Sequence, residues 1–202
     1  MDKGAINIFS RYFNKVCLYI DNSNFLNNLK EIDGNLDRGG RKIDYYKLCC
    51  FIIKELGNRL GINELDLSKV KLYDGLVIND EAKRLKKEKF LQAVKSRVNK
   101  GFCDKKVKVE FGIIELEIGR DHHIKGDDTL LATDIVMDIT QRVCDFAVIV
   151  SGDGDFHSVI HIIKNKFRIP TVVAFFEDFV SGRLREEADI FIPLDIDRIQ
   201  MD

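Results

Sequence analysis

The feature that most constrains the fold is a regular alternation of strand-like and helix-like segments along the whole chain. Short apolar runs of the kind that form buried strands recur between longer segments with helical periodicity. The expected strands cover residues 16–20, 70–73, 107–113, 146–150, 171–176 and 190–194. Because helical crossovers between parallel strands cover both faces of a sheet, this pattern predicts an α/β fold with a central, mainly parallel sheet.

The intervening segments carry helix start and stop signals. Asp44 can cap a helix that runs to Leu60 and ends at Gly61, and Gly101 is expected to stop a long helix that begins at Asp80. The other expected helices lie around 25–29, over 126–143, over about 155–166 and near Leu184, whereas 33–42 is expected to form a Gly-rich loop.

Composition excludes several classes of protein. The chain has 202 residues, and its 32 Lys and Arg nearly balance 33 Asp and Glu, which rules out an evenly basic nucleic-acid coat.

We expect one domain over residues 1–202, with a core over about 16–195 and an N-terminal extension over 1–15. The sequence has no membrane-spanning run and no signal peptide, which predicts a cytoplasmic protein. The oligomeric state stays open, a homodimer included.

The five cysteines are odd in number and include no Cys-x-x-Cys pair. Three of them lie in apolar segments, which favours buried, reduced thiols over disulfides or a zinc site.

Acidic residues follow two of the expected strands and begin one helix. The first strand ends in Asp21-Asn22-Ser23-Asn24, and the strongest strand ends in Ser151-Gly152-Asp153-Gly154-Asp155-Phe156. The segment Lys125-Gly126-Asp127-Asp128 begins the helix before that second strand. In parallel sheets, ligands bind beyond the carboxyl ends of the strands, so these acids are expected at one binding edge.

A single Asp after a strand is commonly a helix N-cap, but this explanation accounts poorly for three clusters at one edge. Carboxylates brought together repel one another unless a cation neutralises them. Oxygen ligands without His or Cys suit Mg²⁺ or Mn²⁺. Such an ion activates water for attack on a phosphodiester. Glycines beside Asp153 would let a substrate backbone approach closely.

These three blocks, in this order, resemble the signature blocks of the NYN domains, in the LabA-like branch of the PIN-like nucleases. The segment from Ser181 to Leu184, followed by 188–192, resembles the closing helix and strand of that family. The resemblance covers about residues 16–195 and implies a PIN-like three-layer α/β/α sandwich. It also implies metal-dependent cleavage of RNA with Mg²⁺ or Mn²⁺ as cofactor.

Carried over by position, the resemblance makes Asp21, Asp128 and Asp153 the catalytic metal ligands. Asp155 supports that cluster as a further catalytic acid, and Asn24 orients Asp21 or contacts the substrate. Lys125 and Ser151 belong to the substrate-binding set. Asp134 matches a recurring family acid, with a structural or supporting role. Asp127 stands where the family more often has an apolar residue, so whether Asp127 or Asp128 faces the metal stays open.

Positive charge is concentrated in one segment. Residues 83–108 hold eleven Lys and Arg against Glu88 and Asp104, a formal charge of +9 within a chain of net charge -1. The segment is interpreted either as a solvated helix surface or as a contact for the RNA phosphate backbone. Arg38 and Arg41, in the Gly-rich loop, would add to the second role as substrate-binding residues.

The leading hypothesis is therefore an endoribonuclease that hydrolyses RNA, with single-stranded RNA as the expected substrate. The alternative is a non-catalytic RNA-binding or regulatory module that uses the same groove, and another metal-dependent phosphotransferase is a third option. His157 and His161 have the His-x-x-x-His spacing of helical zinc sites, but without the Glu of a metalloprotease motif. They are interpreted as flanking an amphipathic helix face, with His157 near enough to the acids to contact substrate.

Overall fold

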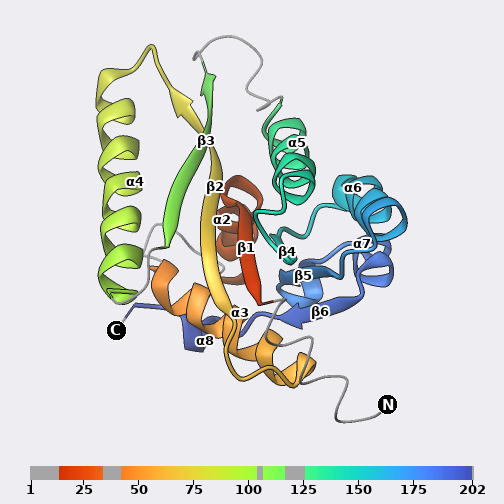
Figure 1. Cartoon of the computed structure of the whole chain (residues 1–202). Coiled ribbons are helices and arrows are strands. Elements are labelled where there is room, and N and C mark those ends of the chain that lie inside the picture. Colours follow the sequence, from red (N-terminus) through yellow and green to blue (C-terminus); the bar gives the residue numbers. More distant parts are fainter. Residues whose placement is uncertain (1–13, 34–41, 104–106, 117–125, 202) are drawn as a thin grey trace, which may run out of the picture.

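A single parallel sheet organises the part of the chain that the structure describes, which is residues 14–33, 42–103, 107–116 and 126–201 of a computed structural model. Its six described strands lie in the order β3-β2-β1-β4-β5-β6, and every pairing is parallel (Figure 1). The strands are β1 (Lys15–Asp21), β2 (Asp66–Val77), β3 (Lys108–Leu116), β4 (Phe146–Val150), β5 (Thr171–Phe175) and β6 (Ile190–Pro193). The prediction of an α/β fold with a parallel sheet is confirmed.

Helices cover both faces of this sheet, which gives the three layers of the expected sandwich (Figure 1). One face carries α2 (Asn22–Asp33), α3 (Tyr45–Leu60), α4 (Glu81–Gly101) and α8 (Ile196–Ile199). The other face carries α5 (Asp127–Thr140), α6 (His157–Ile162) and α7 (Gly182–Glu187). Among the described residues, no helix is both long enough and apolar enough to cross a bilayer.

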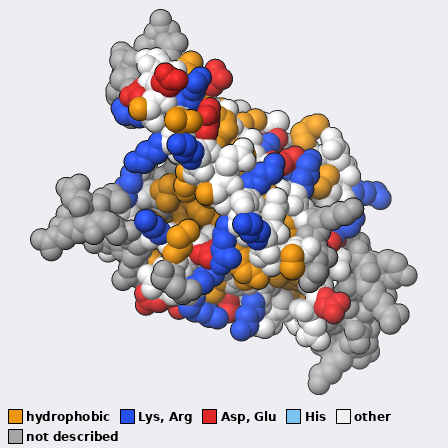
Figure 2. All heavy atoms as spheres, turned by 90° about the vertical axis from the view of Figure 1, so that its left-hand side faces the viewer, with side chains coloured by type: hydrophobic (Ala, Val, Ile, Leu, Met, Phe, Trp, Pro, Cys, Tyr) orange, Lys and Arg blue, Asp and Glu red, His pale blue; other side chains and the backbone are white. Residues whose placement is uncertain are grey.

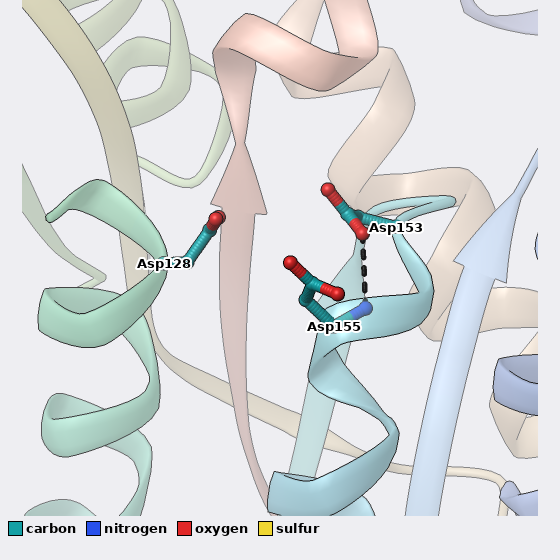
Figure 3. A group of neighbouring side chains, drawn as sticks. All are labelled: Asp128, Asp153 and Asp155. Atoms are coloured by element: carbon teal, nitrogen blue, oxygen red, sulfur yellow. Dashed lines mark hydrogen bonds between the residues drawn. The ribbon is translucent and has the colours of Figure 1, made fainter. Parts of the chain in front are cut away.

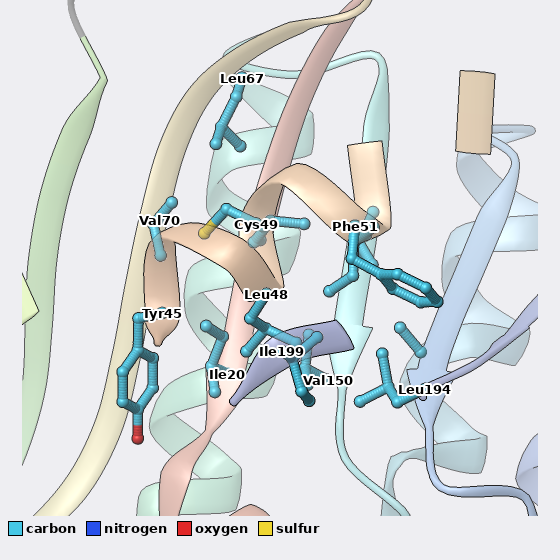
Figure 4. Close-up of a cluster of buried hydrophobic side chains, with 14 of the residues drawn as sticks. Ile20, Tyr45, Leu48, Cys49, Phe51, Leu67, Val70, Val150, Leu194 and Ile199 are labelled. Carbon is cyan, nitrogen blue, oxygen red and sulfur yellow. The ribbon is translucent and has the colours of Figure 1, made fainter. Parts of the chain in front are cut away.

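The core has two parts because successive strand side chains point to opposite faces. On β1, Val16, Leu18 and Ile20 pack under α3, whereas Cys17 and Tyr19 pack under α5. Figure 4 shows the first part, where Ile20 and Val150 meet Leu48 and other side chains of α3. Burying such a side chain contributes about 1.5–3 kcal/mol, so both faces help to fix the register of the central strands.

The local signals for α3 are confirmed. The Asp44 carboxylate accepts hydrogen bonds from the backbone amides of Tyr46 and Lys47, and the helix ends at Gly61, whose φ is 67°. Two side-chain nitrogens of Arg97, on α4, also donate hydrogen bonds to the Asp44 carboxylate, over distances of 2.6–3.1 Å. Burial acts to raise the pKa of Asp44, but these hydrogen bonds outweigh it and hold the pKa below its usual value.

Some helix boundaries differ from expectation. The segment expected as one helix over 155–166 is a 3₁₀ turn (Gly154–Phe156), then α6, then a π-helical turn (Ile163–Phe167). Gly101, expected to follow the end of α4, is its last residue. It packs so closely on the Tyr46 ring that a Cβ would lie 2.1 Å from the ring. The short helix α8 is not predicted by any signal singled out in the sequence.

The order of the strands places the acidic blocks. From β1 the chain proceeds outward through β2 and β3, then returns to the other side of β1 with β4. The order therefore reverses between β1 and β4. Asp21 is the last residue of β1, and the segment with Asp153 and Asp155 follows the adjacent strand β4. The carboxyl ends of β1 and β4 are thus the expected position of a ligand site in a sheet of this kind.

Candidate metal centre at the carboxyl edge of the sheet

Three aspartates meet at this edge. Asp128 lies in the first turn of α5, Asp153 follows β4, and Asp155 lies in the next 3₁₀ turn. One carboxylate oxygen from each lies within 4.8 Å of the others (Figure 3). Figure 3 shows Asp128 pointing across from α5 toward the two other side chains. The structure therefore brings together three of the four predicted catalytic acids.

The donor set of this aspartate group fits a hard divalent cation. All three ligands are carboxylate oxygens, the kind preferred by Mg²⁺ and Mn²⁺. Oxygens bound to one such ion at about 2.1 Å lie no more than about 4.2 Å apart. A small movement of the side chains would therefore bring all three oxygens to one ion. Asp128 and Asp153 are half-buried and Asp155 is exposed, which leaves room for water and substrate on the outer side. Nothing is described of the Asp127 side chain.

Asp21 is joined to this group through Ser151 and is not itself one of the three. The Ser151 hydroxyl donates to Asp21 Oδ2 at 2.9 Å and accepts from the backbone amide of Asp153 at 3.1 Å. The backbone amide of Asn24 donates to Asp21 Oδ1 at 3.0 Å. Asp21 and Ser151 are both buried, with 4% and 0% of their surfaces exposed. This arrangement fixes the position of Asp153, while metal ligation by Asp21 stays a prediction.

The side chain of Asn24 also acts on the loop after β4. Its Oδ1 accepts a hydrogen bond from the backbone amide of Gly152 at 3.0 Å. Together with the Asp21–Ser151 contact, this bond ties the end of β1 to the loop that carries two of the clustered acids. The side chain of Asn24 therefore holds the Gly152 backbone, and its predicted roles of orienting Asp21 or contacting the substrate stay predictions.

The glycines of this loop pack against protein. A Cβ on Gly152 would lie 2.4 Å from the Phe179 carbonyl oxygen and 2.5 Å from the Phe175 ring. A Cβ on Gly154 would lie 2.8 Å from the Ser181 hydroxyl. The expectation that these glycines make room for substrate is therefore wrong, since the protein itself occupies that space.

A second polar network lies beside the aspartate group and was missed by sequence reasoning. Asp74, near the end of β2, is 4% exposed and accepts hydrogen bonds from Asn22 Nδ2 at 2.5 Å and Lys87 Nζ at 2.6 Å. Tyr45 donates its hydroxyl to Asn22 Oδ1. Burial, with the nearby Asp74 charge, raises the pKa of Tyr45 far above its usual value, so the phenol stays protonated as a donor. The available signal was an Asp-Gly pair directly after an apolar strand.

Two further polar side chains define the surroundings of the group. Ser23 Oγ is buried and has no hydrogen-bond partner within the described residues. It lies in the first turn of α2, two residues from Asp21. Asp134, by contrast, accepts hydrogen bonds from Lys71 Nζ at 2.5 Å and the Tyr73 hydroxyl at 2.8 Å. Asp134 therefore anchors α5 to β2, which agrees with the structural role expected for it.

Most of the described part of the basic segment lies on α4, whose outer side is exposed. Figure 2 shows Lys and Arg side chains spread over this face. Lys87 and Arg97 turn inward to Asp74 and Asp44, whereas the side chains on the solvent side include Lys86, Lys89, Lys95 and Lys100. Because α4 follows β2, it begins at the carboxyl edge, and the Lys87–Asp74 contact connects it to that edge. The predicted substrate contacts Lys125, Arg38 and Arg41 lie outside the described residues.

Comparisons with known proteins give a family and a fold. The family model of the NYN domain matches residues 15–195. A crystal structure of a protein of unknown function from Vibrio parahaemolyticus is similar, with a TM-score of 0.63 and 20% sequence identity. The match covers 94% of this chain and 98% of the other, and at this identity it supports the fold alone. A search of the curated proteins finds no match.

Proposed function

This chain belongs to the NYN domain family, and we propose that it is a metal-dependent ribonuclease of the LabA-like branch that hydrolyses phosphodiester bonds in single-stranded RNA. The single observation that carries the proposal is the meeting of Asp128, Asp153 and Asp155 at the edge where the strand order reverses. NYN domains are part of the PIN-like nuclease superfamily, whose members generally use divalent metal ions.

Each residue of the edge has a role in this proposal. Asp128, Asp153 and Asp155 would hold Mg²⁺ or Mn²⁺, which when bound supplies an activated water and stabilises negative charge on the phosphate. Asp21 is proposed as a fourth acid facing the same centre, and through Ser151 it holds the Asp153 backbone in place. Asn24 fixes the loop that positions Asp153 and Asp155.

The surface of α4 is proposed to bind the RNA backbone. Its exposed lysines lie on the helix that begins at the same edge as the aspartate group. Lysines at that position would attract phosphates electrostatically without reading sequence, and they would compensate the repulsion between RNA and the acids. Lys125, Arg38 and Arg41 are proposed as further contacts.

Metal removal tests the proposal most simply. We expect the purified protein to cut labelled single-stranded RNA internally in Mn²⁺ or Mg²⁺, and to lose all cleavage in EDTA. Duplex RNA and single-stranded DNA of the same sequence serve as controls for substrate class. RNA binding that persists in Mn²⁺ with no cleavage of any substrate would contradict the proposal and favour the non-catalytic binding module.

A further inference from the structure

A second group of side chains of the kind that bind metal ions lies on α6 and α7. His157 and His161 are four residues apart on α6, and their rings stack with centroids 6.3 Å apart. Glu187, the last residue of α7, lies against both rings. Its Oε2 is 3.6 Å from His157 Nε2, and its Oε1 is 3.2 Å from His161 Nδ1.

From this geometry we propose that His157, His161 and Glu187 form a binding site for Zn²⁺ or a similar borderline metal ion, separate from the aspartate group. Two imidazoles and one carboxylate are a ligand set that zinc accepts, with water in a fourth position. Mg²⁺ and Mn²⁺ prefer oxygen ligands, so the chemistry of the two groups differs. The proposal therefore stands whether or not the protein cleaves RNA.

The contacts within this group favour a bound cation. The single carboxylate of Glu187 is shared between the two imidazole rings. The contact to His157, at 3.6 Å, is longer than a hydrogen bond. At 3.2 Å, His161 Nδ1 lies equally close to Glu187 Oε1 and to the Asn165 side-chain nitrogen, although one ring nitrogen serves only one such partner at a time. A cation would satisfy the carboxylate and both rings together.

A backbone contact holds Glu187 in place, whereas the more exposed His157 and His161 rings can rotate. Lys164 Nζ donates to the Glu187 backbone carbonyl at 3.0 Å, and the Glu187 side chain is only 21% exposed. The His157 and His161 side chains are 40% and 59% exposed. The ligand atoms of these three side chains do not all lie within 4.8 Å of one another, so zinc binding requires an exposed imidazole to rotate until the two nitrogens are about 3.5 Å apart. A bound ion would then connect α6, which begins two residues after Asp155, to α7.

Zinc binding to the full-length protein tests this inference. After removal of metals, Zn²⁺ is titrated calorimetrically with excess Mg²⁺ present to occupy the aspartate group. We expect one equivalent to bind, and His161→Gln to weaken its affinity by more than about tenfold. Asp153→Asn serves as the matched control and should keep the zinc affinity of the wild type. Because His161 is exposed, its variant should keep the melting temperature of the metal-free wild type.

Two results would overturn the inference. One is zinc binding that survives in His161→Gln and disappears in Asp153→Asn, which would assign the ion to the aspartate group. The other is the lack of saturable binding by the wild type at micromolar Zn²⁺.

Discussion

Replacing Asp153 by Asn should reduce RNA cleavage by at least about 100-fold without weakening the fold. A bound metal ion contributes several kcal/mol of transition-state stabilisation, and each ~1.4 kcal/mol corresponds to a tenfold change in rate. The amide keeps Oδ1, which accepts the backbone hydrogen bond from Asp155 at 2.9 Å. It removes one of three clustered negative charges, so the metal-free variant should melt at the wild-type temperature or above. Single-turnover cleavage in Mn²⁺ and thermal unfolding in EDTA measure the two effects.

Asp145→Asn is the matched control for this substitution. Asp145 lies at the opposite end of β4, where its Oδ2 accepts hydrogen bonds from the backbone amides of Asn14 and Lys15 at 3.0 Å. It should therefore leave the cleavage rate unchanged. Cleavage by Asp153→Asn at the rate of Asp145→Asn would rule out a catalytic role for the aspartate group.

The second large effect concerns the stability of the fold. It involves the ion pair between Lys69 and Asp138, beneath α5. Lys69→Met should lower the free energy of unfolding by about 3–5 kcal/mol, because it leaves a buried carboxylate without its cation. Lys69 is 8% exposed and contacts both Asp138 oxygens, at 2.8 and 2.7 Å. Burial acts to lower the pKa of Lys69, but the bonds to Asp138 outweigh it and raise the pKa, so the ammonium stays charged. Urea unfolding at neutral pH measures the loss.

Two further variants test whether the loss of stability comes from the unpaired Asp138 carboxylate and not from the removal of any lysine. Lys108→Met removes the exposed partner of Glu110, which also lies 3.3 Å from Lys69, and should change stability by less than about 0.5 kcal/mol. The double variant Lys69→Met with Asp138→Asn removes the unpaired charge and keeps an acceptor for the Tyr19 hydroxyl. It should recover most of the loss. A double variant as unstable as the single one would show that packing, not charge, sets the cost.

Local signals predicted much of the fold because their physical causes are local. Five consecutive apolar residues in β4 are buried as expected, and Asp44 and Gly61 delimit α3 as their cap chemistry requires. The site followed from the same reasoning. Strand ends in a parallel sheet meet at one edge, which brought Asp153 and Asp128 together although α5 and β4 are separate elements.

The features that could not be predicted from the sequence depend on contacts between residues that are far apart in the chain. Lys69 and Asp138 are 69 positions apart, and nothing in either segment shows that a lysine on β2 points under α5. The close packing of Gly152 on Phe179 depends on how η4 (Glu177–Phe179) folds back on the loop. The same limit applies to the contacts of Asp21, whose metal ligation stays a prediction. Its position after β1 fits that role, but its partners Ser151 and Asn24 become visible only in three dimensions.

The central claim is that the aspartate group would hold a divalent metal ion in contact with the phosphate that is cut. It is tested by RNA in which one non-bridging oxygen of the scissile phosphate is replaced by sulfur. Mg²⁺ binds sulfur poorly, whereas Mn²⁺ accepts it more readily. We expect the wild type to cut the sulfur-substituted RNA much more slowly than normal RNA in Mg²⁺, and Mn²⁺ to restore most of the rate. An equal sulfur effect in both metals, or cleavage that continues in EDTA, would contradict the claim.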